Sequence, residues 1–156
     1  MNDNKMIIEN EKESQRAPSL HPPIQPSFRD CIKRAERQIE LNTFDYADRL
    51  MAMEVCRIIA EVYLLAGRNN FGGLFIGGEQ IPYQIAEDVY SMLRPEHVEY
   101  VIEEYRGKRY PIRNPKAYFR AMLYNAVFKL ELCRENEFRS DYSADVEEKH
   151  DSGAAY

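Results

Sequence analysis

The chain has 156 residues and a formal net charge of −5, which suits a single domain of ordinary size. No apolar run approaches the ~20 residues of a membrane helix, and the opening MNDNKMIIENEKESQ lacks the apolar core of a secretory signal. Three widely spaced cysteines, Cys31, Cys56 and Cys133, predict no disulfide framework; each falls in an apolar helical pattern typical of a core position. We therefore expect a cytoplasmic protein without membrane association.

Residues 1–27 are polar and then rich in proline, ending in APSLHPPIQPS. Proline has no backbone N–H donor, so this density excludes a helix or a central strand. We expect a disordered amino-terminal arm over residues 1–27.

Helical spacing of apolar residues begins after Ser27, a good helix cap. A first helix is expected from Phe28 to about Leu41, and a second from Asp45 to about Ala66. The second is apolar around much of its circumference, so we expect it to be the most buried element. Gly67 follows it as a candidate cap.

Two Gly-Gly pairs then bracket short apolar stretches in NNFGGLFIGGEQIP. The pattern Leu74-Phe75-Ile76, Gly77-Gly78-Glu79, Gln80-Ile81 predicts a small β-hairpin or a structured turn. A phosphate-binding loop is the alternative, but no Lys-Ser/Thr follows, and the dinucleotide fingerprint has different spacing.

Proline residues mark the starts of the remaining helices, because proline is favoured at the first helical position. Pro82 and Pro95 are expected to begin the third and fourth helices, and Gly107 ends the fourth. Asn114 caps the fifth helix, which is expected to run from Pro115 to about Glu135. The fold class is thus mainly α: a bundle of about five helices over residues 28–135 with a short hairpin between helices two and three. Residues 136–156 are expected to form an acidic mobile tail.

Catalytic and metal-binding patterns are missing from the sequence. There is no HxxxH, HExxH, CxxC or GxSxG, and His97 beside Glu96 is interpreted as surface decoration or a satisfied side chain. The carboxylates of helix four are spread around its solvent side. We expect a protein that is not an enzyme, with no metal, no cofactor and no small-molecule substrate.

Charge is segregated along the second half of the chain. Residues 79–104 carry seven acids and one base, whereas residues 106–134 carry eight bases and one acid. On the fifth helix Tyr118, Phe119, Met122, Leu123, Ala126, Leu130 and Cys133 fill one arc of about 140° and are expected to face the core. Lys116, Arg120 and Tyr124 share a flank of that arc, at positions i, i+4 and i+8.

This basic, aromatic flank fits nucleic acid, because cations release counterions from phosphates and a tyrosine can stack on a base. The alternative is that Lys116 and Arg120 pair with the acidic outer face of helix four, within or between molecules. The predicted DNA-binding residues are Arg109, Arg113, Lys116, Arg120 and Tyr124.

A family resemblance rests on Ile76 to Glu79, Glu96 to Val101 and Ile112 to Ala126, with the clear likeness covering about residues 74–128. The order of IGGE, EHVEYV and IRNPKAYFRAMLYNA resembles the carboxy-terminal domain of replication initiator A proteins from plasmids and integrative elements of low-GC Gram-positive bacteria. More distantly the last helix resembles the helical module of the DnaD and DnaB primosome proteins, with Tyr118 and Met122 matching in character and Ala126 in place of a tryptophan.

The resemblance implies a non-enzymatic replication-accessory module of a mobile genetic element that binds DNA, a replication protein, or both. Initiators of this family carry an amino-terminal winged-helix domain, so we expect a stand-alone copy of the accessory domain. The primosome proteins oligomerise, which makes a homo-oligomer a further expectation. The alternative is a small protein-interaction module that inhibits a host defence or replication protein without binding DNA, with its acidic surfaces mimicking DNA.

Overall fold

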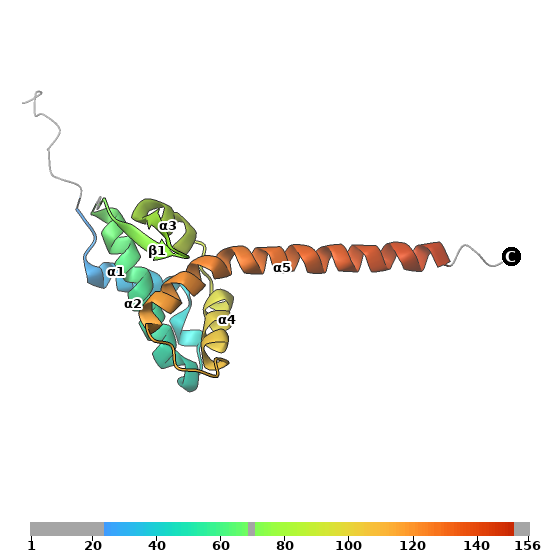
Figure 1. Ribbon diagram of the computed structural model, residues 1–156, viewed down its shortest axis with the longest axis horizontal. Coiled ribbons are helices and arrows are strands. Elements are labelled where there is room, and N and C mark those ends of the chain that lie inside the picture. Colours follow the sequence, from blue (N-terminus) through green and yellow to red (C-terminus); the bar gives the residue numbers. More distant parts are fainter. Residues whose placement is uncertain (1–23, 69–70, 152–156) are drawn as a thin grey trace, which may run out of the picture.

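The computed structural model describes residues 24–68 and 71–151, with side chains described as far as residue 142. The described elements are five α-helices, one 3₁₀ turn and one two-stranded hairpin, the hairpin lying between the second and third helices (Figure 1). The predicted fold class is confirmed. The predicted arm falls mostly on residues outside the described ranges; residues 24–27 are exposed and have no regular structure.

Helix α1 (Phe28–Gln38) begins with the cap that the sequence predicts. The Ser27 hydroxyl accepts the Asp30 N–H at 3.2 Å, and the Asp30 carboxylate accepts the Ser27 N–H at 3.1 Å, which completes a capping box. The helix ends three residues earlier than expected. Glu40 adopts a φ of 51°, and the 3₁₀ turn η1 (Leu41–Thr43) leads into the next helix.

Helix α2 (Tyr46–Gly67) lies at the centre of the core. Asp45 caps it by accepting the Asp48 N–H at 2.9 Å. Its buried side chains belong to nine residues: Ala52, Val55, Cys56, Ile58, Ile59, Ala60, Val62, Tyr63 and Ala66. The burial is not uniform, because Leu50 is 68% exposed and Met53 is 40% exposed near the amino-terminal end of the helix.

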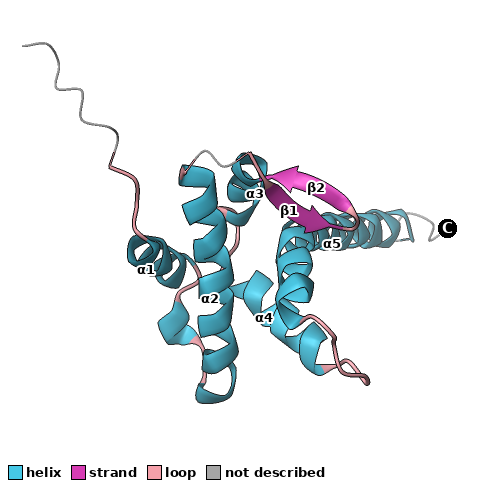
Figure 2. Cartoon of the chain, turned by 60° about the vertical axis from the view of Figure 1, so that its left-hand side comes forward, coloured by secondary structure: helices cyan, strands magenta, loops and turns pink. Residues whose placement is uncertain are grey.

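Strands β1 (Gly73–Ile76) and β2 (Glu79–Pro82) form the predicted hairpin, which lies beside α3 and α5 (Figure 2). Ile76 pairs with Glu79 across a two-residue turn in which Gly77 and Gly78 have φ values of 61° and 85°. Two consecutive positive φ values require a type I′ turn, which glycine adopts without strain. The glycine pair is therefore explained by turn chemistry.

Helix α3 (Tyr83–Tyr90) starts one residue later than predicted, because Pro82 is still extended, with ψ of 142°, and ends the strand. Helix α4 (Pro95–Arg106) starts at its proline as predicted, and it buries Val98, Val101 and Ile102. Helix α3 packs mainly on α2, and helix α4 packs mainly on α5.

Helix α5 (Pro115–Asp151) confirms the predicted start, since the Asn114 side-chain oxygen accepts the Ala117 N–H at 3.1 Å. The predicted end near Glu135 is wrong. No glycine or proline occurs between Pro115 and Gly153, so nothing in the sequence stops the helix, and it continues to Asp151. The helix consequently projects from the globular part of the molecule (Figure 1).

This projection corrects one core prediction. Phe119, Leu123, Ala126 and Val127 are buried, but Cys133 is exposed because it lies beyond the last turn of α5 that the other helices cover. Cys31 and Cys56 are buried as expected. None of the described helices combines the length and the apolar composition that a membrane span requires.

Polar side chains fasten α1 to the rest of the core. The Gln38 amide donates to the carbonyls of Tyr90 at 2.7 Å and Leu93 at 2.9 Å, and its oxygen accepts the Tyr63 hydroxyl. Arg34 pairs with Glu87 of α3 at 2.9 Å and stacks over the Tyr63 ring at 3.7 Å. These contacts hold α1, α2 and α3 together at one end of the domain.

Candidate nucleic-acid interface

Two of the predicted DNA-binding cations are held by a single carboxylate. Lys116 Nζ lies 2.6 Å from one oxygen of Glu61, and an Arg120 guanidinium nitrogen lies 2.8 Å from the other. Glu61 belongs to α2, so the alternative of pairing with the acidic face of α4 within one molecule is wrong for these two residues. It is Arg134, further along α5, that contacts Glu96 of α4.

The electrostatics of Glu61 reflect this pairing. Partial burial acts to raise its pKa, but the hydrogen bonds and charges of Lys116 and Arg120 outweigh that effect, and the net result is a pKa below its usual value. Glu61 is therefore ionised at neutral pH, and it neutralises part of the positive charge that the sequence places on this face.

Arg120 is partly a structural residue. Its side chain is only 31% exposed, its carbonyl accepts the Tyr90 hydroxyl at 2.8 Å, and its Nε is buried without a partner among the described residues. Lys116 is 51% exposed and is the more accessible of the two. A phosphate can therefore reach Lys116 more easily than Arg120.

The loop between α4 and α5, residues 107–114, carries the accessible positive charge. Lys108, Arg109 and Arg113 are exposed, and none forms an ion pair with any described residue. Tyr110 lies among them and is 67% exposed. Residues 105, 106 and 108–112 line a hollow of about 350 Å³. We call residues 108–113 the cationic loop.

Both ends of the cationic loop are anchored. Arg106 at the end of α4 pairs with Asp48 and donates to the Ala47 carbonyl at 2.8 Å, which ties the loop to α2. The Tyr105 ring lies 4.9 Å from Phe119 and 5.9 Å from Tyr118, so the last turn of α4 packs on the first turns of α5. The loop is thus held by rigid elements, as binding loops commonly are.

Tyr124 lies apart from the cationic loop. It is half-buried, and its ring packs against Phe128 with 5.6 Å between centroids. Eight residues of helix separate it from Lys116, which is about 12 Å along the axis. The structure therefore brings Arg109 and Arg113 into one loop, places Lys116 just after it, and leaves Arg120 and Tyr124 further along α5.

His97 is a satisfied core residue. It is 4% exposed, and its Nδ1 accepts the Arg94 N–H at 3.0 Å at the start of α4. Burial lowers its pKa, with a smaller opposing effect from Glu96. Among the described side chains, no group of His, Cys, Asp and Glu is arranged to hold a metal ion.

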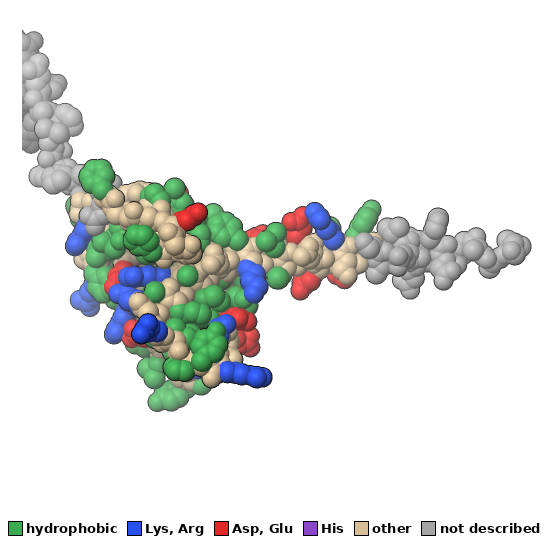
Figure 3. Space-filling model, viewed as in Figure 1, with side chains coloured by type: hydrophobic (Ala, Val, Ile, Leu, Met, Phe, Trp, Pro, Cys, Tyr) green, Lys and Arg blue, Asp and Glu red, His purple; other side chains and the backbone are tan. Residues whose placement is uncertain are grey.

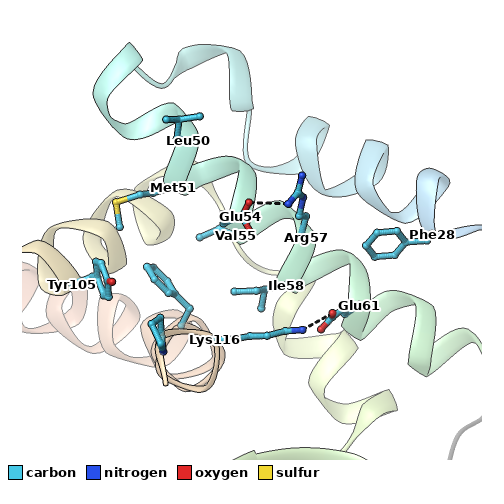
Figure 4. A pocket seen from close by; sticks show the side chains of 12 residues that line it. Phe28, Leu50, Met51, Glu54, Val55, Arg57, Ile58, Glu61, Tyr105 and Lys116 are labelled. Carbon is cyan, nitrogen blue, oxygen red and sulfur yellow. Dashed lines mark hydrogen bonds and ion pairs between the residues drawn. The ribbon is translucent and has the colours of Figure 1, made fainter. Parts of the chain in front are cut away.

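An apolar groove lies beside this interface, between α2 and the first turns of α5 (Figure 4). It has a volume of about 570 Å³. Its floor is formed by Val55, Ile58 and Phe119, and Lys116 with Glu61 closes one end. The candidate interface and the apolar groove therefore share the amino-terminal turn of α5.

Glu61, Lys108 and Tyr110 are the residues that the sequence reasoning missed. Glu61 is the only charged residue between Arg57 and Arg68, within a run of buried positions. A lone carboxylate in such a run indicates an ion pair at the edge of the core, because a charged side chain is rarely buried without a partner of opposite charge. Lys108 and Tyr110 lie beside Arg109 in the same loop, so the helix-based reading passed over them.

Comparison with protein-family models, curated proteins and solved structures finds no match to this chain. The likeness to replication initiator A proteins stays a prediction from the residues quoted above. The proposals below rest on the geometry of the cationic loop and of the groove beside it.

Proposed function

We propose that this chain is a non-enzymatic module that binds DNA through the cationic loop and the first turn of α5. The resemblance to the initiator family supports the further proposal that this module assists replication of a mobile genetic element. The observation that carries the proposal is the cluster of three exposed cations around an exposed tyrosine, with no acidic partner among the described residues.

The chemistry of this cluster suits a nucleic acid. Lys108, Arg109 and Arg113 can each neutralise a phosphate and release a counterion. Tyr110 offers an exposed ring on which an unpaired base can stack, an interaction worth roughly 1–3 kcal/mol. The anchored ends of the loop favour binding because less conformational freedom is lost on association.

The first experiment replaces Lys108, Arg109 and Arg113 together with glutamine and measures DNA affinity by fluorescence anisotropy over a range of salt. Three lost phosphate contacts reduce the slope of log affinity against log salt by about 2.7 on duplex DNA. The matched control replaces Arg29, Lys33 and Arg37, three exposed cations of α1, and removes the same charge elsewhere. Equal losses in the two triple variants would refute the assignment to the loop.

The second experiment tests Tyr110 with single-stranded DNA. The Tyr110→Ala variant is expected to bind more weakly by roughly 1–3 kcal/mol with an unchanged salt slope, because stacking carries no charge. Tyr46→Ala is the control, since Tyr46 is 91% exposed on α2. An affinity of Tyr110→Ala equal to that of the control would remove Tyr110 from the interface.

A second candidate function is favoured by the acidic face of α4. Glu99 and Glu103 are exposed and form no ion pair with any described residue. A surface of this kind suits a protein-interaction module that mimics DNA towards a basic host protein. Strong retention on an anion exchanger, with no retention on heparin and no DNA binding, would favour this function over the first.

A further inference from the structure

We infer that two copies of this chain form a closed dimer in which the projecting part of α5 from each copy lies in the α2–α5 groove of the other. Two features of the chain that no described residue covers support it: the groove itself and an apolar stripe on α5. This inference is independent of DNA binding and goes beyond the proposed function.

The groove has the form of a helix-binding site. Met51, Val55 and Ile58 of α2 point into it, and Tyr105 of α4 and Phe28 of α1 stand at its sides (Figure 4). Leu50 lines it while being 68% exposed. An apolar groove with half-exposed large side chains is typical of surfaces that bind the apolar face of an amphipathic helix.

The stripe provides such a face. Phe128, Leu132, Phe138 and Tyr142 are between 47% and 74% exposed. At 100° per residue they lie, with Tyr124, within an arc of about 120° on one side of α5. Hydrophobic side chains stand among the charged ones along the projecting helix (Figure 3). Helices in water gain most of their stability from packing such a face, and no described residue of the chain packs against this part of α5.

The stripe cannot reach the groove of its own chain. Phe119 lines the groove, and α5 is one continuous helix from Pro115 to Asp151. At 1.5 Å per residue, Leu132 lies about 20 Å and Phe138 about 28 Å further along the axis. Contact between stripe and groove therefore requires a second molecule.

Charged residues accompany both surfaces. Glu131, Glu135 and Arg139 lie within the arc of the stripe. The groove is lined by two ion pairs, Arg57 with Glu54 and Lys116 with Glu61. Both cations are more than half exposed although each already contacts one carboxylate. A carboxylate from a partner helix can therefore approach these two exposed cations in addition to Glu54 and Glu61.

Two-fold symmetry allows both copies to make the same contact. One copy offers a stripe and a groove, so two copies related by a two-fold axis satisfy both pairs of surfaces and leave none open. The groove and the stripe are thus explained by one interface, with a second copy of the chain as the occupant.

Sedimentation equilibrium on the full chain tests the inference. The wild type is expected at twice the 18.3 kDa of one chain, and Leu50→Glu in the groove or Leu132→Glu in the stripe at 18.3 kDa. Phe75→Glu is the matched control, because Phe75 is 70% exposed on the hairpin, and it should remain a dimer. Phe28→Glu is a second groove variant, and a cooperative circular dichroism melt shows that each variant folds.

Mixing the two monomeric variants gives the decisive result. The stripe of Leu50→Glu is intact and the groove of Leu132→Glu is intact, so the mixture should recover a heterodimer with one of the two contacts. A wild type that stays at 18.3 kDa at all concentrations would overturn the inference. Groove variants that remain dimeric while Leu132→Glu dissociates would also overturn it, because that outcome means that the two stripes pair with each other. A mixture of the two variants that recovers no dimer would overturn it as well.

Discussion

Glu61 controls how much positive charge the interface offers, and replacing it with glutamine isolates that effect. The substitution keeps the size of the side chain and removes the charge that holds Lys116 at 2.6 Å and Arg120 at 2.8 Å. If both released cations contact phosphates, the salt slope on duplex DNA steepens by about 1.8. Because Arg120 is less exposed than Lys116, a smaller increase of about 0.9 corresponds to Lys116 alone.

The same substitution is expected to destabilise the folded protein while it frees cations for DNA binding. Partly exposed ion pairs contribute about 0.2–1 kcal/mol each, so we expect Glu61→Gln to lower the free energy of unfolding by about 1 kcal/mol. Since the pKa of Glu61 is lowered in the folded state, its contribution is present above the usual value of 4.5 and is lost as the pH falls through the folded pKa. The stability difference between the wild type and Glu61→Gln should therefore narrow in acid.

Fluorescence anisotropy over a range of salt measures the binding, and urea unfolding measures the stability. Glu99→Gln is the control, because it removes one exposed carboxylate that holds no described cation. A Glu61→Gln slope equal to the Glu99→Gln slope would show that Glu61 does not compete with DNA for these two cations.

Three further predictions concern the fold that holds the interface in place. Tyr90→Phe removes the hydroxyl that donates to the Arg120 carbonyl at 2.8 Å from a fully buried ring, and we expect a loss of about 0.5–1.5 kcal/mol in urea unfolding. The pKa of His97 is lowered by burial, so its folded form resists protonation and stability falls as the pH drops through the usual value of 6.5. The His97→Gln variant, which keeps an acceptor for the Arg94 N–H, should flatten this dependence of stability on pH. Gly78→Ala places a side chain at a φ of 85° and should lower the free energy of unfolding by roughly 1–2 kcal/mol, measured by thermal unfolding. Gln80→Ala on the exposed side of β2 is the control and should lower it by less, because φ is negative at that position.

Local signals in the sequence predicted most of the fold. The caps at Ser27 and Asn114 and the prolines at Pro95 and Pro115 place helix starts correctly, because capping depends on side chains a few residues apart. The glycine pair at the hairpin is equally local. Helix ends were less predictable: α5 continues to Asp151 because the distal half has no residue that stops it, while apolar spacing alone suggested an end at the edge of the core.

The candidate interface was predictable only in part. Charge segregation pointed to the region that contains the cationic loop, and Arg109, Arg113 and Lys116 lie at or beside that loop. A helical wheel also grouped Arg120 and Tyr124 with them, but a wheel describes one helix and contains no information on its neighbours. The contact between Arg120 and Glu61 spans 59 residues of sequence, and the packing of Tyr124 on Phe128 depends on where the domain ends along α5.

An electrophoretic mobility measurement on single- and double-stranded DNA at about 50 mM and about 200 mM salt tests the central claim most directly. The cationic loop predicts a shifted complex at the lower salt that weakens at the higher salt. With three to four phosphate contacts, the expected loss on duplex DNA is about 40- to 150-fold over that fourfold change. No shift with either DNA at the lower salt, for a chain that remains folded, would contradict the account.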